Sequence, residues 1–215
     1  VSDDEIELLD EWFEERVFPV LTPLAVDPGH PFPYISDLAL SLAVNVADPE
    51  TGDRRFARLK VPRLFPRLVE TSPGRFLPVE QLIAAKLDRL FVGMIIEDWA
   101  PFRVSRNADL TLEEEEADDL LEAVEMELRR RRFNKAVRLE VSHDIGAEVL
   151  ELLVRELDLT MDDVTFHRSP LDLSCLWQLM DLERPDLKDE AWPPVTAGRI
   201  IAAEETDRPI FDVMR

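Results

Sequence analysis

Three histidines are the residues of this chain best suited to carry a proton or to accept a phosphoryl group near neutral pH. They are His30, His143 and His167, and they lie far apart in the sequence. A histidine that accepts a phosphoryl group needs cations beside it, and only His167 is followed by an arginine. The residues after His167 also miss the His-x-Lys spacing of phospholipase-D-like sites. We therefore expect none of the three histidines to be catalytic.

Arginines are the next candidates, because guanidinium groups bind phosphate. Arg103 and Arg106 are weak candidates for phosphate contact, and they lie three residues apart on a predicted strand, so they face opposite sides. Either arginine can instead pair with nearby acids. Arg129–Arg132 end a predicted helix that begins with acids, an order that suits the helix dipole. Because four consecutive helical residues point in different directions, we do not expect them to form one phosphate site.

Carboxylates and cysteine form no metal-binding pattern in this sequence. Asp118-Asp119 and Asp162-Asp163 could hold Mg²⁺ weakly. We interpret them as solvated surface, because adjacent acids are common in so acidic a chain. Cys175 is the single cysteine, which excludes an internal disulfide and a multi-cysteine metal site. It stands in an apolar helical run, so we expect it in the core.

The sequence also lacks the common nucleotide-binding and nucleophile motifs. No P-loop, GxGxxG, GxSxG or HExxH pattern is present. Four tryptophans have no regular spacing, so we expect core or interface positions for them, not a cofactor site: Trp12, Trp99, Trp177 and Trp192. These patterns predict no cofactor in this chain.

Charge is the strongest feature of the composition. Twenty-five basic residues against 46 acidic ones give a net charge of −21 over 215 residues. Such a surface repels nucleic acid, anionic lipid and any polyphosphate at long range, so we expect no nucleic-acid partner. A hydrophobic content of 46% argues against disorder. No apolar run reaches the roughly 18 residues of a membrane span, so we expect no span. The single cysteine suits a reducing compartment, so we expect a cytoplasmic location.

The first third of the chain predicts a helix, a connector and a hairpin. Residues 2–17 have helical periodicity, with Ser2 and Glu5 at capping-box spacing. We expect prolines to prevent regular structure over residues 19–33, so that this stretch is a rigid connector and His30 a local structural donor. Residues 38–46 and 54–61 alternate in hydrophobicity around a DPETGD turn, which predicts a β-hairpin.

Helices and strands are mixed over the rest of the chain. Periodicity predicts helices at 79–91, 111–133, 147–157 and 171–182. It predicts strands at 102–107, 137–141 and 163–167. Residues 184–198 have the composition of a linker, and the chain begins without Met, so we expect it to be a piece of a longer protein. The predicted fold is mixed α+β, with one mixed sheet opened by the hairpin and helices packed on it.

Several of these stretches together resemble a known family. They are FPVLTPLAVDPGHPFPYISDLALSLAV, RRFARLKVP, FRVSRNADL, DDLLEAVEMELRRRRF, VRLEV and RPDLKD. They resemble the middle, or head, region of the larger class of polyphosphate kinase, whose C-terminal half is similar to phospholipase D. The resemblance runs from about residue 5 to the end. It weakens in VETSPGRFLP and over residues 191–207.

The resemblance implies an enzyme that transfers the γ-phosphate of ATP, with Mg²⁺, reversibly onto polyphosphate through a phosphohistidine. The family's catalytic, cofactor and metal residues map onto no position of this chain, so the resemblance implies none here. It divides the chain into a connecting helix at 1–17, a head domain at 18–183 and a linker at 184–215 toward catalytic domains. It implies a non-catalytic scaffold that forms a homodimer or higher homo-oligomer, with the membrane surface as an alternative location for the intact enzyme. The alternative reading is a stand-alone phosphate-binding or protein-interaction module that uses its arginines.

Overall fold

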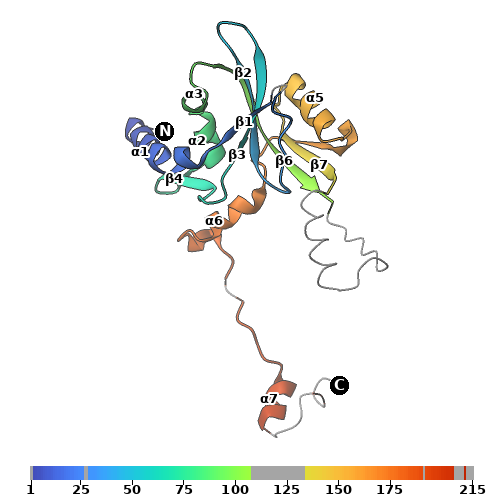
Figure 1. The fold of residues 1–215 in the computed structure, drawn as a ribbon. Helices are drawn as coiled ribbons and strands as arrows, with labels where there is room; N and C mark the ends of the chain where they lie inside the picture. Colours follow the sequence, from blue (N-terminus) through green and yellow to red (C-terminus); the bar gives the residue numbers. More distant parts are fainter. Residues whose placement is uncertain (1, 27–28, 108–133, 191, 206–210, 212–215) are drawn as a thin grey trace, which may run out of the picture. The chain divides into compact units, whose positions relative to one another are not determined.

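A sheet of six strands forms the centre of the first part of the chain, and Figure 1 shows it between helices α1–α3 and helix α5. The computed structural model describes residues 2–26, 29–107, 134–190, 192–205 and 211. The strands follow the order β1-β3-β2-β6-β7-β8, and all neighbours are antiparallel except the parallel pair β7–β8. Their bounds are β1 Pro23–Val26, β2 Ser41–Ala47, β3 Arg54–Lys60, β6 Ile95–Arg106, β7 Ala136–Ser142 and β8 Val164–His167. The predicted mixed α+β fold with a β2–β3 hairpin is confirmed.

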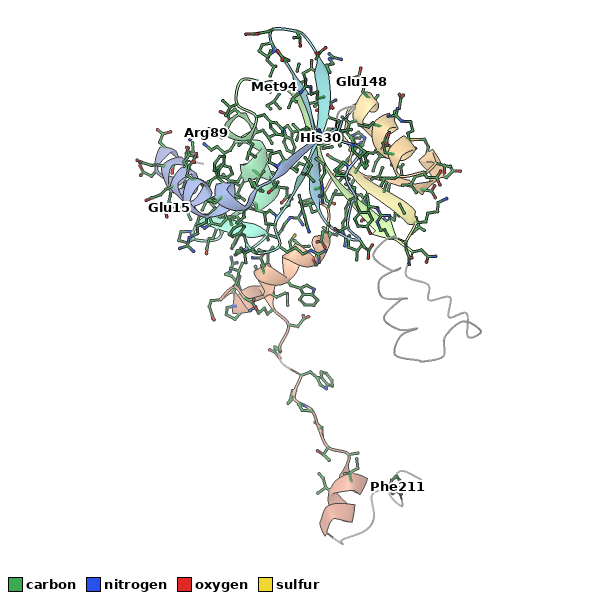
Figure 2. All side chains as sticks on the ribbon, viewed as in Figure 1. Glu15, His30, Arg89, Met94, Glu148 and Phe211 are labelled. Carbon is green, nitrogen blue, oxygen red and sulfur yellow. The ribbon has the colours of Figure 1, made fainter. Side chains whose placement is uncertain are left out.

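Helices cover both faces of this sheet. The helices packed on it are α1 Asp3–Trp12, α2 Val79–Ala84, α3 Leu87–Leu90 and α5 Ala147–Glu156. The described residues also form α6 Trp177–Met180 and, in a separate unit of the chain, α7 Gly198–Glu205. A π-helical turn spans Phe13–Val17, and 3₁₀ turns span Phe18–Val20, Met161–Asp163, Leu173–Leu176 and Pro185–Leu187. In Figure 2, Arg89 of α3 and Glu148 of α5 lie on opposite sides of the sheet. No helix in the described ranges is both long and apolar enough to cross a membrane.

The central strand β2 is buried on both faces, and two apolar cores follow from this. Leu42 and Val44 pack with Leu59 of β3 and with apolar residues of α1, α2 and α3. The alternate residue Ala43 packs in a second core with Phe102 of β6 and apolar residues of α5. Because successive side chains of a strand point to opposite faces, one short strand anchors both helical layers.

The proline-rich stretch contains a strand that sequence reasoning excluded. β1 pairs antiparallel with β3, and Leu24 lies opposite Arg58. The expectation of no regular structure over residues 19–33 is therefore wrong. Proline is tolerated as the first residue of an edge strand, where its missing N–H costs no ladder bond, and Pro23 occupies that position. The next strand, β2, begins at Ser41 and not at residue 38, because Leu38 has a left-handed backbone with φ of 52°.

Two further differences concern proline and helix ends. β6 is twice the length predicted for it, and Pro101 lies within it. Within β6, only Phe102–Arg106 pair with β7. At Pro101 the strand therefore has β2 as its one neighbour, and no backbone amide is needed on the open side.

The predicted helix at 79–91 is divided into α2 and α3, because Lys86 N donates to Ile83 O at 3.0 Å in a tightened last turn.

A small second sheet was not predicted. β4 (Leu68–Ser72) and β5 (Arg75–Pro78) form an antiparallel hairpin outside the main sheet. Gly74 lies in its turn with φ of 76°, a conformation that glycine adopts without strain. The single-sheet expectation is thus corrected to one six-stranded sheet plus this hairpin.

The chain divides into two units, Val1–Met180 and Asp181–Arg215. The first unit contains both sheets. The described part of the second contains the turn at Pro185–Leu187 and the helix α7. The proposed division at residues 17 and 183 stays a prediction. The longest predicted helix, at 111–133, lies outside the described residues.

The start of α1 carries a carboxylate with an altered pKa. Glu5 Oε2 accepts from Ser2 N at 2.7 Å, and Ser2 Oγ accepts from Glu5 N at 3.3 Å, which confirms the predicted capping box. Hydrogen bonds from Ser72 and then from Ser2 lower the pKa of Glu5 from 4.5 to about 2. Because the folded pKa lies below the unfolded one, this stabilisation is complete above pH 4.5 and is lost as the pH falls toward 2.

We therefore expect Glu5→Gln to flatten the acid end of the stability profile. The thermal midpoint of the unchanged chain should fall more steeply between pH 4.5 and 2 than that of the variant, as measured by circular dichroism. Glu7→Gln removes the same charge at an exposed position of α1 and should keep the steeper profile. Parallel profiles for Glu5→Gln and the unchanged chain would contradict this prediction.

Candidate functional site

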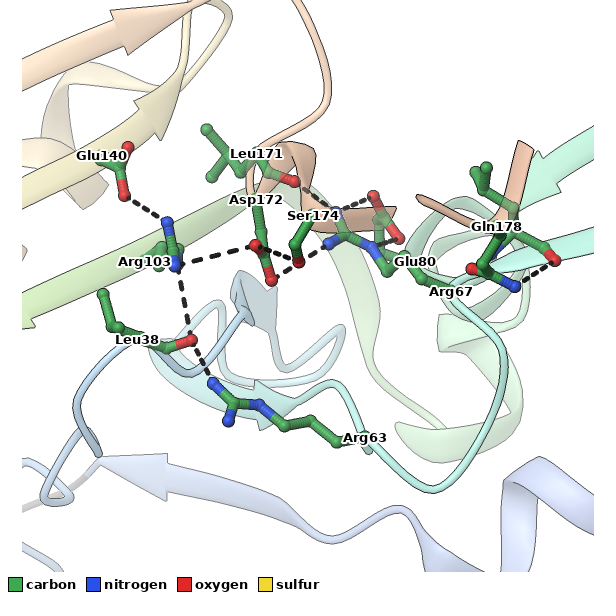
Figure 3. Close-up of polar contacts among 11 residues, drawn as sticks. Leu38, Arg63, Arg67, Glu80, Arg103, Glu140, Leu171, Asp172, Ser174 and Gln178 are labelled. Carbon is green, nitrogen blue, oxygen red and sulfur yellow. Dashed lines mark hydrogen bonds and ion pairs between the residues drawn. The ribbon is translucent and has the colours of Figure 1, made fainter. Parts of the chain in front are cut away.

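Arg103 lies on β6 and is held by three groups of the same chain (Figure 3). Its Nη1 lies 3.0 Å from Glu140 Oε2 on β7, and its Nη2 lies 3.7 Å from Asp172 Oδ1. Its Nε donates to Leu38 O at 3.4 Å. The side chains of Arg103 and Glu140 are 18% and 11% exposed. This candidate for phosphate contact is therefore occupied by internal acceptors.

Arg67 forms a second buried pair beside it. Its Nε and Nη2 donate to the two carboxylate oxygens of Glu80 at 2.7 and 2.6 Å, a bidentate geometry. Nη2 also donates to Leu171 O at 2.7 Å. Burial opposes the charge on Arg67, but the hydrogen bonds and charge of Glu80 outweigh it, so its pKa is raised. Sequence reasoning did not single out Arg67 or Glu80, because the acid stands among apolar helix residues without any motif.

Asp172 joins the two pairs. Its carboxylate lies 3.8 Å from Arg67 Nη1 and accepts from Ser174 Oγ at 2.7 Å. Burial raises the pKa of Asp172. The Ser174 hydrogen bond and the charges of Arg103 and Arg67 lower it by more, so the pKa lies below its usual value. The backbone of Asp172 is left-handed, with φ of 56°. We call Arg67, Glu80, Arg103, Glu140 and Asp172 the arginine latch, because they tie the segment after β8 to the sheet.

The arginine latch is completed by a side chain from α6. Leu68 N donates to Gln178 Oε1 at 2.9 Å, and Gln178 Nε2 donates to Leu68 O at 3.5 Å. Together with the Arg67 bond to Leu171 O, these contacts dock residues 171–178 against β4 and α2. The arrangement fixes the path of the chain immediately before the second unit.

A hollow of about 410 Å³ lies beside the arginine latch. Apolar and polar side chains both line the hollow: Leu38, Leu40, Val61, Pro62, Arg63, Phe65, Arg67, Arg103, Asp172, Ser174 and Cys175. An oxyanion entering it would have to displace carboxylates that already hold Arg67 and Arg103. The hollow is therefore poorly suited to phosphate.

Arg106, the other candidate, contacts a different set of groups. Its Nε donates to Ile35 O at 2.8 Å and its Nη1 to Asn134 O at 2.7 Å. Its guanidinium carbon lies 4.3 Å from the centre of the Tyr34 ring, a cation–π distance. These contacts hold the loop before β2 against the end of β6. Whether either arginine contacts phosphate stays a prediction.

The histidines occupy separate positions, although two of them share a strand end. His30, labelled in Figure 2, is exposed. His143 N donates to His167 O at 2.8 Å, because β7 and β8 run parallel and end together. His167 Nε2 lies 3.6 Å from Glu140 Oε1, so it faces the same acid that holds Arg103. Sequence reasoning missed this juxtaposition, since parallel pairing joins distant residues.

The remaining candidates are accounted for by local structure. Asp163 accepts from Thr160 N and Oγ1 at 2.8 Å, and these bonds lower the pKa of its carboxyl. Cys175 is buried as predicted, and burial raises the pKa of its thiol. Within the part of the chain that the structure describes, no three His, Cys, Asp or Glu side chains could jointly hold a metal ion. Asp118-Asp119 and Arg129–Arg132 lie outside the described residues.

The tryptophans divide between packing and exposure. Trp12 is partly buried and packs edge-on against Phe65, with ring centres 5.6 Å apart. Trp99 is 37% exposed, Trp177 73% and Trp192 91%. Trp12 is therefore a packing residue, and the other three present apolar surface.

The chain is similar in sequence to known proteins of one family. The family model described as polyphosphate kinase middle domain matches residues 4–179. A polyphosphate kinase of Mycolicibacterium gilvum is 50% identical over 222 residues, covering 100% of this chain and 30% of the relative. One of Streptomyces coelicolor is 53% identical over 204 residues, covering 94% and 27%.

A solved structure supports the fold. The crystal structure of polyphosphate kinase from Porphyromonas gingivalis superposes with a TM-score of 0.72 at 22% identity, covering 94% of this chain and 29% of that one. At this identity the likeness concerns the fold. The chain spans about 30% of the length of the curated relatives named above. With the matched model covering both sheets and the arginine latch, the chain belongs to the polyphosphate kinase middle-domain family.

Proposed function

We propose that this chain is a structural domain of a polyphosphate kinase that supplies no catalytic residue of its own. The observation that carries the proposal is the arginine latch. Its two guanidinium groups, on Arg67 and Arg103, are held by carboxylates and carbonyl oxygens of the chain, at distances from 2.6 to 3.8 Å. Groups so occupied fix the position of residues 171–178 and do not present free donors to a transferred phosphoryl group.

The activity proposed for the whole protein follows from its relatives. They are named polyphosphate kinase, and this chain corresponds to their middle domain. We propose that the whole protein transfers phosphate from ATP, with Mg²⁺, reversibly onto polyphosphate. The catalytic, ATP-binding and metal-binding residues would then lie in the parts of the enzyme that this chain does not span.

Self-association through this domain is a further part of the proposal. Four apolar side chains on α6 and on the 3₁₀ turn before it are 47–73% exposed: Leu173, Leu176, Trp177 and Met180. Apolar residues exposed together favour protein contacts. A homodimer predicts a sedimentation coefficient for the 215-residue chain that rises with concentration, and a constant monomer value would refute a contact made by this domain alone.

A chimera tests the structural role directly. This chain replaces the matching segment of the Streptomyces coelicolor relative, to which it is 53% identical. The chimera should make labelled polymer from γ-labelled ATP and Mg²⁺. The 215-residue chain by itself should form neither polymer nor acid-labile label. Label on the isolated chain would identify His30, His143 or His167 as a nucleophile and would overturn the proposal.

The alternative function, phosphate binding through Arg103 or Arg106, makes a different prediction. It requires polyphosphate binding that weakens steeply with salt and that Arg103→Gln or Arg106→Gln abolishes. The structural role predicts that both substitutions lower stability, since each removes internal bonds, and leave any anion binding of the folded chain unchanged.

A further inference from the structure

A second hollow lies at the β1 edge of the main sheet. Its volume is about 430 Å³, and β1, β3 and the segment after β3 form its walls. We call it the edge hollow, and its lining residues are Val20, Thr22, Leu24, Arg58, Lys60, Pro62, Arg63 and Leu64. Three of these residues are cations and none is an acid, in a chain with a net charge of −21.

Arg58 is the unusual member of the edge hollow. The residue is 6% exposed, and its Nε donates to Ser41 Oγ at 3.1 Å. Within the described ranges its Nη2 has no hydrogen-bond partner and the guanidinium forms no ion pair. Burial lowers the pKa of Arg58, since no acid offsets the loss of water around the charge. A buried charge without a partner destabilises the folded chain. A bound anion would remove this cost by pairing with the guanidinium of Arg58.

The other two cations are also without acids. Lys60 lies on the same strand as Arg58 and is exposed. Arg63 is exposed and donates from Nη2 to Leu38 O at 2.7 Å, a neutral acceptor. Neither forms an ion pair with any residue that the structure describes. The contrast with the arginine latch is direct, because Arg67 and Arg103 there each face two carboxylates.

We propose that the edge hollow binds a multiply charged oxyanion of the phosphate class, held by Arg58, Lys60 and Arg63. Two guanidinium forks and an ammonium suit phosphoryl oxygens, which accept bidentate bonds. A single carboxylate would leave two of the three cations uncompensated and a phosphate dianion would leave one, whereas pyrophosphate carries enough negative charge to balance all three. The volume is at least several times that of one water molecule, about 30 Å³, so a short phosphate chain also fits. The proposal does not depend on the structural role argued above.

Titration of the 215-residue chain with inorganic phosphate, pyrophosphate and linear triphosphate at low salt tests the proposal. Binding is measured by calorimetry and by the rise in thermal midpoint, with chloride at equal ionic strength as the reference. Lys60→Gln and Arg63→Gln should each weaken binding at least tenfold. Arg55→Gln removes the same charge from an exposed residue of β3 that does not line the hollow, and it should change affinity less than twofold.

Arg58→Met separates a ligand role from a structural one. If the guanidinium serves an anion, this variant should raise the thermal midpoint of the free chain and lose the rise that phosphate causes. A lowered midpoint together with a retained phosphate effect would show that Arg58 is structural and would overturn the proposal. So would failure of all three anions to bind, or binding that Lys60→Gln and Arg63→Gln leave intact.

The three probes also identify the source of the bound group. Equal affinity for phosphate and triphosphate, lost in Lys60→Gln, supports a site for the free ion. Tighter binding of triphosphate, lost in the same variant, supports a site for the end of a phosphate chain. Binding that is lost in Arg103→Gln and kept in Lys60→Gln would contradict the edge hollow and would instead favour phosphate contact at the arginine latch.

Discussion

Glu80→Ala is expected to lower the free energy of unfolding by about 3 to 5 kcal/mol, the usual cost of breaking one side of a buried ion pair. The side chains of Arg67 and Glu80 are 14% and 6% exposed. Removal of the acid leaves the guanidinium buried, with Asp172 at 3.8 Å as its remaining ion-pair partner among the described residues. Urea denaturation measures the change.

Two comparisons show whether the loss comes from the uncompensated charge. The double variant Arg67→Met with Glu80→Leu replaces the pair by apolar groups and should recover most of the stability. Arg155→Ala removes the exposed pair with Glu156, whose side chains are 69% and 33% exposed, and should cost less than about 1 kcal/mol. A loss below about 1 kcal/mol for Glu80→Ala would contradict the prediction.

The same substitution should loosen the docked segment. Leu68 N donates to Gln178 Oε1. This hydrogen bond requires residues 171–178 to stay docked, and Arg67 docks them by donating to Leu171 O. Hydrogen exchange at the Leu68 amide should therefore be faster in Glu80→Ala. If exchange there were unchanged while stability fell, the arginine latch would stabilise the core without positioning the segment.

Phe13→Ala is expected to cost about 3 to 5 kcal/mol, since large aromatic side chains deleted from a core lose both transfer free energy and packing. Phe13 is 0% exposed and its ring centre lies 6.1 Å from that of Phe18. It packs in the first core with Leu9 and Val17, and so fixes the N-terminal helix to the sheet.

A matched control is available on α1, the helix that leads directly into the turn containing Phe13. Leu8 is 62% exposed, so Leu8→Ala should change the free energy of unfolding by less than about 0.5 kcal/mol. Both variants are compared by chemical denaturation, and the curves are fitted with one shared dependence of the unfolding free energy on denaturant concentration. Equal small losses for Phe13→Ala and Leu8→Ala would show that α1 is not fastened through Phe13.

Local rules allowed much of the fold to be predicted from the sequence. The capping box at Ser2 and Glu5, the β2–β3 hairpin, β7, β8 and α5 each follow from a pattern complete within about 20 residues. The alternation of residues 38–46 fits a strand buried on one face or on both, and in the structure both faces of β2 are buried. In such stretches the side chains that decide the structure are sequence neighbours.

Proline was misjudged where tertiary pairing decides its cost. Pro23 and Pro101 both lie in strands, although proline usually argues against a strand. Each occupies a position with a neighbouring strand on one side only. A missing N–H costs a bond only where a partner strand requires it, and the sequence does not specify the partner.

The sequence by itself determined an acidic mixed α+β domain without a motif for nucleotide or metal binding. Tertiary structure alone decided what its arginines do. Arg103 meets acids from β7 and from the 171–178 segment, while Arg58 on β3 meets none among the described residues. Both are arginines on alternating strands, so local pattern cannot separate them. Electrostatic energy depends on the distance between charges in space, and for these residues the fold sets that distance.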